Sequence, residues 1–123
     1  MNNINIKITL LMKKILFFAL SLALFAACSK PASNLTYVSD TFTVNGSCGM
    51  CKTNIEKAAK IPGVATAVWN QKANSLTVKY APSKVDIMAV HKSIAAAGYD
   101  TDKAHGDDAA YGKLPGCCKY RDK

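Results

Sequence analysis

The chain has 123 residues, of which 50% are hydrophobic and 20% charged, and its formal net charge is +8 at pH 7. Three lysines fall in the first 14 residues, and the other basic residues are spread along the chain rather than gathered in one stripe with aromatic side chains. This composition fits one small domain with a single core, excludes a second domain for lack of length, and argues against a nucleic-acid-binding protein.

Residues 1–27 predict a signal peptide. Lys13 and Lys14 precede an apolar run, 15–27, that is shorter than the roughly 20 residues needed to cross a bilayer, and small residues lead up to Cys28. Residues 25–28, Phe-Ala-Ala-Cys, resemble a bacterial lipobox, which implies cleavage before Cys28 and lipidation of its sulfur. We therefore expect an exported lipoprotein, anchored to the membrane by lipid and facing the periplasm. The alternative is an ordinary signal peptide whose cleavage site contains a cysteine.

Three further regions follow the signal peptide. Residues 28–40 are rich in small, polar and proline residues and predict a flexible tether. Residues 41–103 carry the periodic patterns of a folded domain. Residues 104–123 form a C-terminal tail that contains a Cys-Cys pair.

The first part of the domain predicts a strand, a helix and a hairpin. The strands show alternating or β-branched apolar residues, and the helix has one apolar face, lysines on the other, and a Pro-Gly stop. In chain order we expect strand 41–44, helix 51–60, and strands 64–69 and 76–80 around the turn 71–74.

A second helix and a last strand complete the predicted domain. Ser83 is the expected N-cap of the helix, with Asp86 three residues later, close to a capping box. An apolar stripe at helical spacing follows, Gly98 supplies the stop, and a short strand begins at Tyr99. The order β-α-β-β-α-β predicts an α+β ferredoxin-like sandwich, with a four-stranded antiparallel sheet and two helices on one face.

A Cys-x-x-Cys pair, Cys48 and Cys51, stands where the first strand turns into the first helix. The free N–H groups and the positive end of the dipole at a helix N-terminus favour the thiolate over the thiol. Two thiolates that face one point bind soft metal ions or exchange disulfides. The sequence shows no Ser-His-Asp set, paired carboxylates or phosphate-binding glycine loop, so we expect a protein that is not an enzyme.

Several motifs in the right order resemble the heavy-metal-associated domain, the family of copper chaperones, the N-terminal modules of copper-transporting P-type ATPases and the periplasmic mercury carrier. These motifs are Cys48-x-x-Cys51, Ile55–Ala58, Ile61–Val64 and Ala97–Tyr99. The resemblance implies that Cys48 and Cys51 bind one soft ion, commonly Cu(I), and pass it by ligand exchange to a metal-transporting ATPase or another metal-receiving protein. It also implies that Tyr99 lies in the loop beside the site.

The identity of the ion stays open, because Cu(I), Hg(II), Ag(I), Zn(II) and Cd(II) all accept two thiolates. Many family members have a Met two residues before the first cysteine, packed beneath the loop, and this chain has Gly46 there. Met50 is therefore the candidate to support the site. Its side chain fills the gap under the loop or faces solvent, and ligation through its thioether is the less favoured hypothesis.

The tail carries a second pair of thiols, Cys117 and Cys118. If the tail folds back, they add one or two sulfurs to an ion held by Cys48 and Cys51. Alternatively they form a vicinal disulfide, cross-link to the first pair or bridge two molecules, and an oxidising periplasm favours such disulfides. The sequence leaves metal ligation and a disulfide both open.

A thiol-disulfide redox protein is the alternative from another functional class. Thioredoxin-like enzymes have a β-α-β unit before the cysteine pair, an aromatic residue just before the first cysteine and a proline facing the pair. Here Ser47 precedes Cys48, one short strand comes before it, and Pro82 lies at a strand-helix junction. The favoured prediction is a membrane-tethered periplasmic chaperone or scavenger for Cu(I), with an Hg(II)-binding carrier as a further alternative.

Overall fold

The computed structural model describes residues 5–14 and 34–123. The chain divides into two units, Met1–Ser33 and Asn34–Lys123. The apolar part of the predicted signal peptide, 15–27, and the predicted lipidation site, Cys28, lie outside the described residues. Within the described ranges, none of the helices combines the length and the apolarity that crossing a membrane requires.

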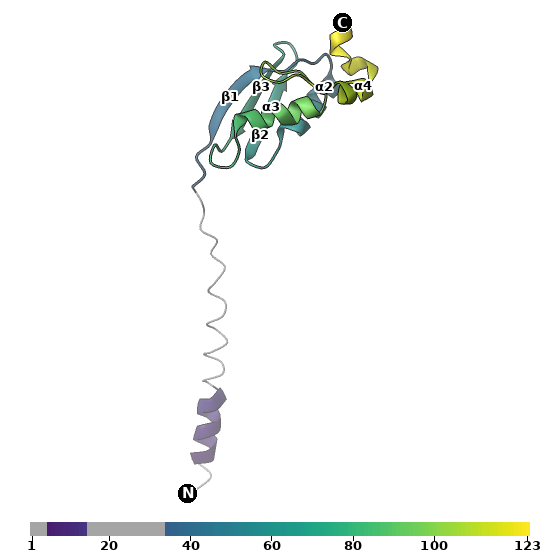
Figure 1. Cartoon of the computed structure of the whole chain (residues 1–123). Coiled ribbons are helices and arrows are strands. Elements are labelled where there is room, and N and C mark those ends of the chain that lie inside the picture. Colours follow the sequence, from purple (N-terminus) through teal and green to yellow (C-terminus); the bar gives the residue numbers. More distant parts are fainter. Residues whose placement is uncertain (1–4, 15–33) are drawn as a thin grey trace. The chain divides into compact units, whose positions relative to one another are not determined.

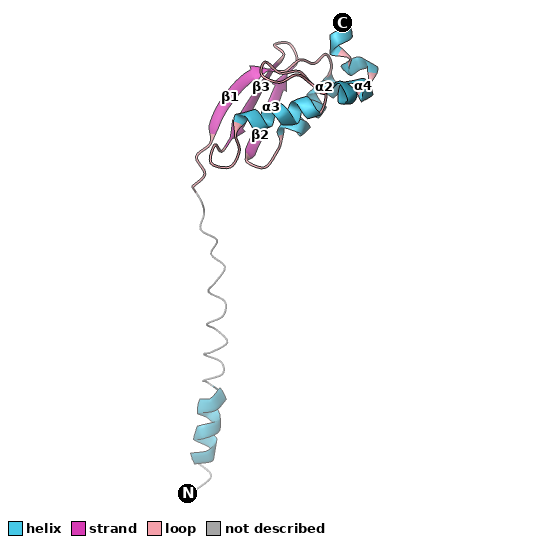
Figure 2. Cartoon of the chain, in the orientation of Figure 1, coloured by secondary structure: helices cyan, strands magenta, loops and turns pink. Residues whose placement is uncertain are grey.

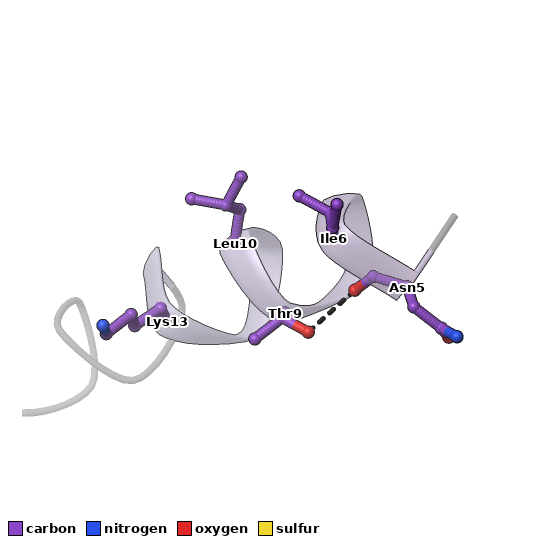
Figure 3. A pocket seen from close by; sticks show the side chains of 5 residues that line it. All are labelled: Asn5, Ile6, Thr9, Leu10 and Lys13. Atoms are coloured by element: carbon purple, nitrogen blue, oxygen red, sulfur yellow. Dashed lines mark hydrogen bonds between the residues drawn. The ribbon is translucent and has the colours of Figure 1, made fainter. Parts of the chain in front are cut away.

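Residues 5–14 of the first unit form a helix whose apolar side chains are exposed. Thr9 Oγ1 donates a hydrogen bond to the Asn5 carbonyl at 2.7 Å, and the surrounding side chains edge a depression on this one helix (Figure 3). A depression lined by a single helix has no second wall to enclose a ligand, so we assign no site to it.

Three antiparallel strands form the sheet of the second unit, in the order β1-β3-β2 (Figures 1 and 2). Along β3, Leu76 and Val78 are fully buried, and the residues between and around them are exposed or partly exposed. This alternation gives the sheet one core-facing side. The strands are β1 (Val38–Thr43), β2 (Val64–Asn70) and β3 (Ser75–Tyr80).

Two helices, α2 (Gly49–Ala59) and α3 (Ile87–Ala96), pack on the core-facing side. In α2 the buried residues Cys51, Ile55 and Ala59 recur every four positions, which is the spacing of one helix face. Val90 and Ile94 of α3 join them in one core cluster with the buried side chains of the sheet. This arrangement is the predicted α+β ferredoxin-like architecture with one strand fewer.

The prediction of a fourth strand from Tyr99 is wrong for the described part of the chain. A single bridge between Val44 and Thr101 stands in its place. Thr101 N donates to the Ala104 carbonyl at 2.8 Å, and Thr101 Oγ1 accepts from Ala104 N at 2.9 Å. Because these bonds close a tight turn, the segment after Tyr99 pairs with the first strand's continuation only at Thr101 and then turns away.

Several predicted boundaries also differ from the structure. α2 begins at Gly49 and ends at Ala59, whereas the sequence predicts 51–60, and β2 and β3 are each one residue longer than predicted. β1 begins at Val38, which pairs with Tyr80, so the last three residues of the predicted tether belong to the sheet. They do so because β3 extends far enough to pair with them. The N-cap of α3 is Asp86 rather than Ser83, since the Asp86 carboxylate accepts a hydrogen bond from Met88 N at 2.8 Å.

The tail folds into short helical segments that pack on the domain. Asp107 caps the first of them by accepting from Ala110 N at 2.7 Å. Gly98 has a φ of +91°, and a Cβ there would lie 2.7 Å from Tyr111 N, so this glycine lets the tail approach the end of α3 closely. The tail reaches the region of α2 (Figure 1). Its segments are α4 (Asp108–Lys113), η2 (Gly116–Cys118) and η3 (Tyr120–Asp122).

Candidate metal centre

The first thiol pair is placed by the junction between β1 and α2. Cys48 is the N-cap of α2, with an extended backbone (φ −151°, ψ 171°), and Cys51 lies in the first turn of the helix. The two sulfurs are 3.4 Å apart. Cys51 is fully buried and Cys48 is partly exposed, so the pair presents one sheltered and one accessible thiol.

Trp69 of β2 supports the loop that carries these thiols. Its side chain is buried, and its indole Nε1 donates to the Val44 carbonyl at 2.9 Å. A Cβ on Gly46 would lie 2.8 Å from the indole ring and 3.1 Å from Cys51 Cβ, so only glycine permits this close approach. Met50 is 51% exposed and faces solvent, and the supporting place under the loop belongs to Trp69 instead.

A charged contact joins α2 to β2 beside the loop. Glu56 pairs with Lys52 and accepts from Trp69 N at 2.8 Å, and Lys52 Nζ donates to the Trp69 carbonyl at 2.9 Å. Burial raises the pKa of Glu56, but the hydrogen bonds from Lys52 and Trp69 outweigh burial and hold this pKa below its usual range. The charged carboxylate therefore fixes the helix that carries the thiols.

The tail brings the second thiol pair to the first. Cys48 Sγ lies 3.3 Å from Cys117 Sγ and 3.4 Å from Cys118 Sγ, and the two tail sulfurs are 3.8 Å apart. The sulfurs of Cys48, Cys117 and Cys118 all lie within 4.8 Å of one another. All four thiols, including that of Cys51, are free. We call these four residues the thiol cluster.

The thiols of the cluster differ in acidity. Burial raises the pKa of Cys48, but hydrogen bonds from the Cys51 backbone and from the neighbouring thiols outweigh burial and lower it to about 6. Burial raises the pKa of Cys118 well above its usual value, and the sulfurs of Cys51 and Cys48 add to this. The hydrogen bond to Cys48 is the main cause that raises the pKa of Cys117. These shifts favour the thiolate at Cys48 and the protonated thiol at Cys117 and Cys118.

Tyr99 lies beside the tail thiols. Its side chain is buried, its hydroxyl accepts from Asn54 Nδ2 at 3.1 Å and contacts the Cys118 thiol, and its ring stacks on Tyr120 with the centroids 5.9 Å apart. Burial raises the pKa of Tyr99 above its usual value, so the hydroxyl stays protonated.

The spacing of the sulfurs fits a soft metal ion. With metal–sulfur bonds of about 2.3 Å, ligand sulfurs stand about 3.8 Å apart around a tetrahedral ion, about 4.0 Å apart around a trigonal ion and about 4.6 Å apart across a linear one. The observed separations of 3.3 to 3.8 Å are closer to the tetrahedral and trigonal values than to the linear one. A small opening of the cluster would therefore admit an ion.

Comparison with known proteins places the folded domain in a family. The model of the heavy-metal-associated domain matches residues 41–100. The structure of CopZ metallochaperone is similar, with 35% identity and a TM-score of 0.50, over 52% of this chain and 98% of that chain. This chain belongs to the heavy-metal-associated domain family. The match includes Cys48 and Cys51 and ends before the tail.

Two further proteins resemble this heavy-metal-associated domain. Copper-transporting ATPase 1 of Rhizobium meliloti (strain 1021) is 37% identical over 70 residues, which are 55% of this chain and 8% of that protein. The chain thus spans a small part of the length of this curated relative. Oxidized MerP from Ralstonia metallidurans CH34 is 25% identical, with a TM-score of 0.52, over 55% of this chain and 96% of that chain.

Sequence reasoning missed two residues that join the tail to the heavy-metal-associated domain at the thiol cluster. Ser47 Oγ donates to the Cys117 carbonyl at 2.5 Å. Lys123 Nζ donates to the same carbonyl at 2.9 Å and to Ser47 Oγ at 3.3 Å. No local pattern signals these contacts, because the partners are far apart in the sequence. The second pair of cysteines was the only sign that the tail belongs to the site.

Proposed function

We propose that the chain carries a soft metal ion, Cu(I) in the first place, bound through Cys48 and Cys51. The observation that supports this most is the thiol cluster, in which three free thiols lie within contact of Cys48 inside a heavy-metal-associated domain. Soft thiolates select Cu(I) among the first-row ions, and they also accept Hg(II), Ag(I) and Zn(II). The proposed role is carriage, as a chaperone or scavenger, rather than catalysis.

The proposed recipient of the ion is a metal-transporting ATPase or another metal-receiving protein. This follows from the similarity to Copper-transporting ATPase 1 and to CopZ metallochaperone. The proposed place of action is the periplasmic face of a membrane, with a lipid anchor at Cys28. Support for this location comes from the sequence pattern of residues 1–28 alone.

A thiol-disulfide redox protein is the second candidate. It is favoured by the pKa of about 6 at Cys48 and by the short distance of 3.3 Å from Cys48 Sγ to Cys117 Sγ. A low-pKa thiolate beside a second thiol is suited to disulfide exchange. This candidate predicts that the protein accelerates the reduction of insulin by dithiothreitol, which a metal carrier does not do.

A competition titration tests the metal proposal. The unit Asn34–Lys123 contains the core cluster and is compact by itself, so it serves for the measurement. Reduced protein competes with a chromophoric chelator for Cu(I) without oxygen, and we expect one ion to bind per chain. Because both main ligands are lost, Cys48→Ser/Cys51→Ser weakens binding at least about 100-fold, or about 2.7 kcal/mol.

Met50→Leu is the control for this titration, since Met50 lies between the two cysteines and faces solvent. We expect it to bind Cu(I) as the wild type does. A wild-type protein that does not compete with the chelator rejects Cu(I) as the cargo. Titrations with Hg(II), Ag(I) and Zn(II) and the insulin assay then distinguish another ion from the redox candidate.

A further inference from the structure

The tail, residues 104–123, follows the part of the chain that the family model matches, 41–100. A carrier that binds its ion through two thiols does not need this segment. It nevertheless holds a defined position. Cys118 is fully buried, and its sulfur lies 3.4 Å from Cys48 Sγ and 3.8 Å from Cys117 Sγ. A loose surface segment would leave this side chain in water, so specific contacts must hold the tail in place.

Arg121 and Asp100 supply the strongest of these contacts. Arg121 Nε donates to Asp100 Oδ2 at 2.9 Å, and Arg121 Nη2 donates to Asp100 Oδ1 at 2.7 Å. Arg121 also donates to the Gly106 carbonyl at 2.9 Å and lies 4.4 Å from the centroid of the Tyr111 ring. A bidentate arginine–carboxylate pair combines charge with a fixed orientation. We call the pair Asp100–Arg121 the latch.

Tyr120 fastens the tail at a neighbouring point. Its hydroxyl donates to the Gly98 carbonyl at 2.9 Å and accepts from Asp100 N at 2.8 Å. Its ring stacks on Tyr99 and meets the edge of Tyr111 at a centroid distance of 5.2 Å. Gly98 and Asp100, the neighbours of Tyr99 in the sequence, thus both form hydrogen bonds with Tyr120 of the tail.

A third set of contacts closes over the thiol cluster itself. Ser47 Oγ donates to the Cys117 carbonyl and accepts from Lys123 Nζ, and these two bonds tie the tail to the loop of the first thiol pair. Lys123 Nζ also donates to the Cys117 carbonyl within the tail. Lys123 Nζ thus places a positive charge at the Cys117 carbonyl, on the backbone that carries one of the tail thiols. Several thiolates around one monovalent ion carry net negative charge, and a nearby cation offsets their repulsion.

We propose that the tail is a strap that completes the metal site: Cys118 and Cys117 release their thiol protons to solvent and add thiolate ligands to the ion at Cys48 and Cys51, and the latch keeps this set closed. The inference rests on the proposed function, because it adds ligands to the same ion. The sulfurs of Cys48, Cys117 and Cys118 stand 3.3 to 3.8 Å apart in all three pairs, which suits a trigonal or tetrahedral ion better than a linear one. Cys51 Sγ lies 3.4 Å from Cys48 Sγ, next to this set. Release of the ion to a recipient then requires the tail to undock.

X-ray absorption spectroscopy of the Cu(I)-loaded unit Asn34–Lys123 counts the sulfur ligands directly. We expect three or four sulfurs in the wild type and two in Cys117→Ser/Cys118→Ser, with affinity in this variant lowered at least about tenfold. Two sulfurs in the wild type, or unchanged affinity and sulfur count in the variant, overturn the strap. Loss of all Cu(I) binding in the wild type instead rejects the proposed function, so the two failures are distinguishable.

Arg121→Ala tests the latch while leaving all four thiols in place. We expect an excess of chelator to remove Cu(I) from this variant at least about tenfold faster than from the wild type, since the tail undocks more readily. Lys113→Ala is the matched control, because it removes one positive charge from the same tail, and we expect wild-type release. Circular dichroism establishes that each variant is folded. If Arg121→Ala releases Cu(I) at the wild-type rate, the latch is overturned. This test does not depend on whether Cys117→Ser/Cys118→Ser folds.

Discussion

The size of one residue, Gly46, sets the shape of the loop that carries the first thiol pair. Trp69 fits beneath the loop because Gly46 has no side chain, and its indole bond to Val44 fixes the ring there. The sequence places Trp69 at the end of the predicted strand 64–69. The sequence does not predict that the Trp69 side chain lies under the loop, because this position depends both on the pairing of β2 with β3 and on the conformation of the loop.

Gly46→Ala is expected to destabilise the domain by about 1–3 kcal/mol, because the new methyl group would lie 2.8 Å from the indole and Trp69 must shift. Urea unfolding of the unit Asn34–Lys123 measures the change in the free energy of unfolding. Gly49→Ala is the matched control, since a Cβ at Gly49 meets nothing within 4 Å and a helix favours alanine over glycine. Equal losses in both variants would show that contact with Trp69 is not the cause.

Among the elements, those with a local repeat were predictable and those held by distant contacts were not. The helix after Cys48 and the hairpin of β2 and β3 follow from apolar spacing and turn residues, and the structure has both. The strand expected from Tyr99 fails because the hydroxyl and backbone of Thr101 close a turn. The position of the tail could not be predicted, because the latch joins residues 21 apart with no periodic pattern between them.

The latch makes stability depend on pH at the acid end. The hydrogen bond from Arg121 lowers the pKa of Asp100 to about 2, although burial opposes it. The folded-state pKa lies below the unfolded value of about 3.9, so the contribution of the charged carboxylate is complete above that pH and is lost as the pH falls toward 2. We expect wild type to lose more free energy of unfolding than Asp100→Asn over this window.

Urea titrations of both proteins at several pH values between about 5 and 2 measure this difference. Burial lowers the pKa of His91, and because His91 titrates in both proteins, its effect on stability cancels in the comparison. Parallel stability profiles for wild type and Asp100→Asn would show that the latch carboxylate contributes nothing in this window.

At the scale of the whole unit Asn34–Lys123, a bound ion would join the start of α2 to the tail. An ion that binds the folded state and not the unfolded chain stabilises the fold by mass action, by about 2.7 kcal/mol when the free ion is at 100 times its dissociation constant. For a domain of this size we expect the melting temperature to rise by about 10 °C or more. Differential scanning calorimetry in buffered Cu(I) measures the rise, and the melting temperature of Cys48→Ser/Cys51→Ser, which lacks the main ligands, is expected to rise by no more than about 3 °C.

The contacts from Cys48 to the tail thiols span 69 and 70 residues of sequence, and this separation has a consequence in time. A polypeptide is made from its N-terminal end, so Cys48 and Cys51 emerge from the ribosome well before Cys117 and Cys118. Closing such a long loop also comes late in folding, because its entropic cost precedes the gain from the contacts. In each new molecule the site therefore passes through a stage with two thiols before it has four, and docking of Cys118 marks the end of that stage.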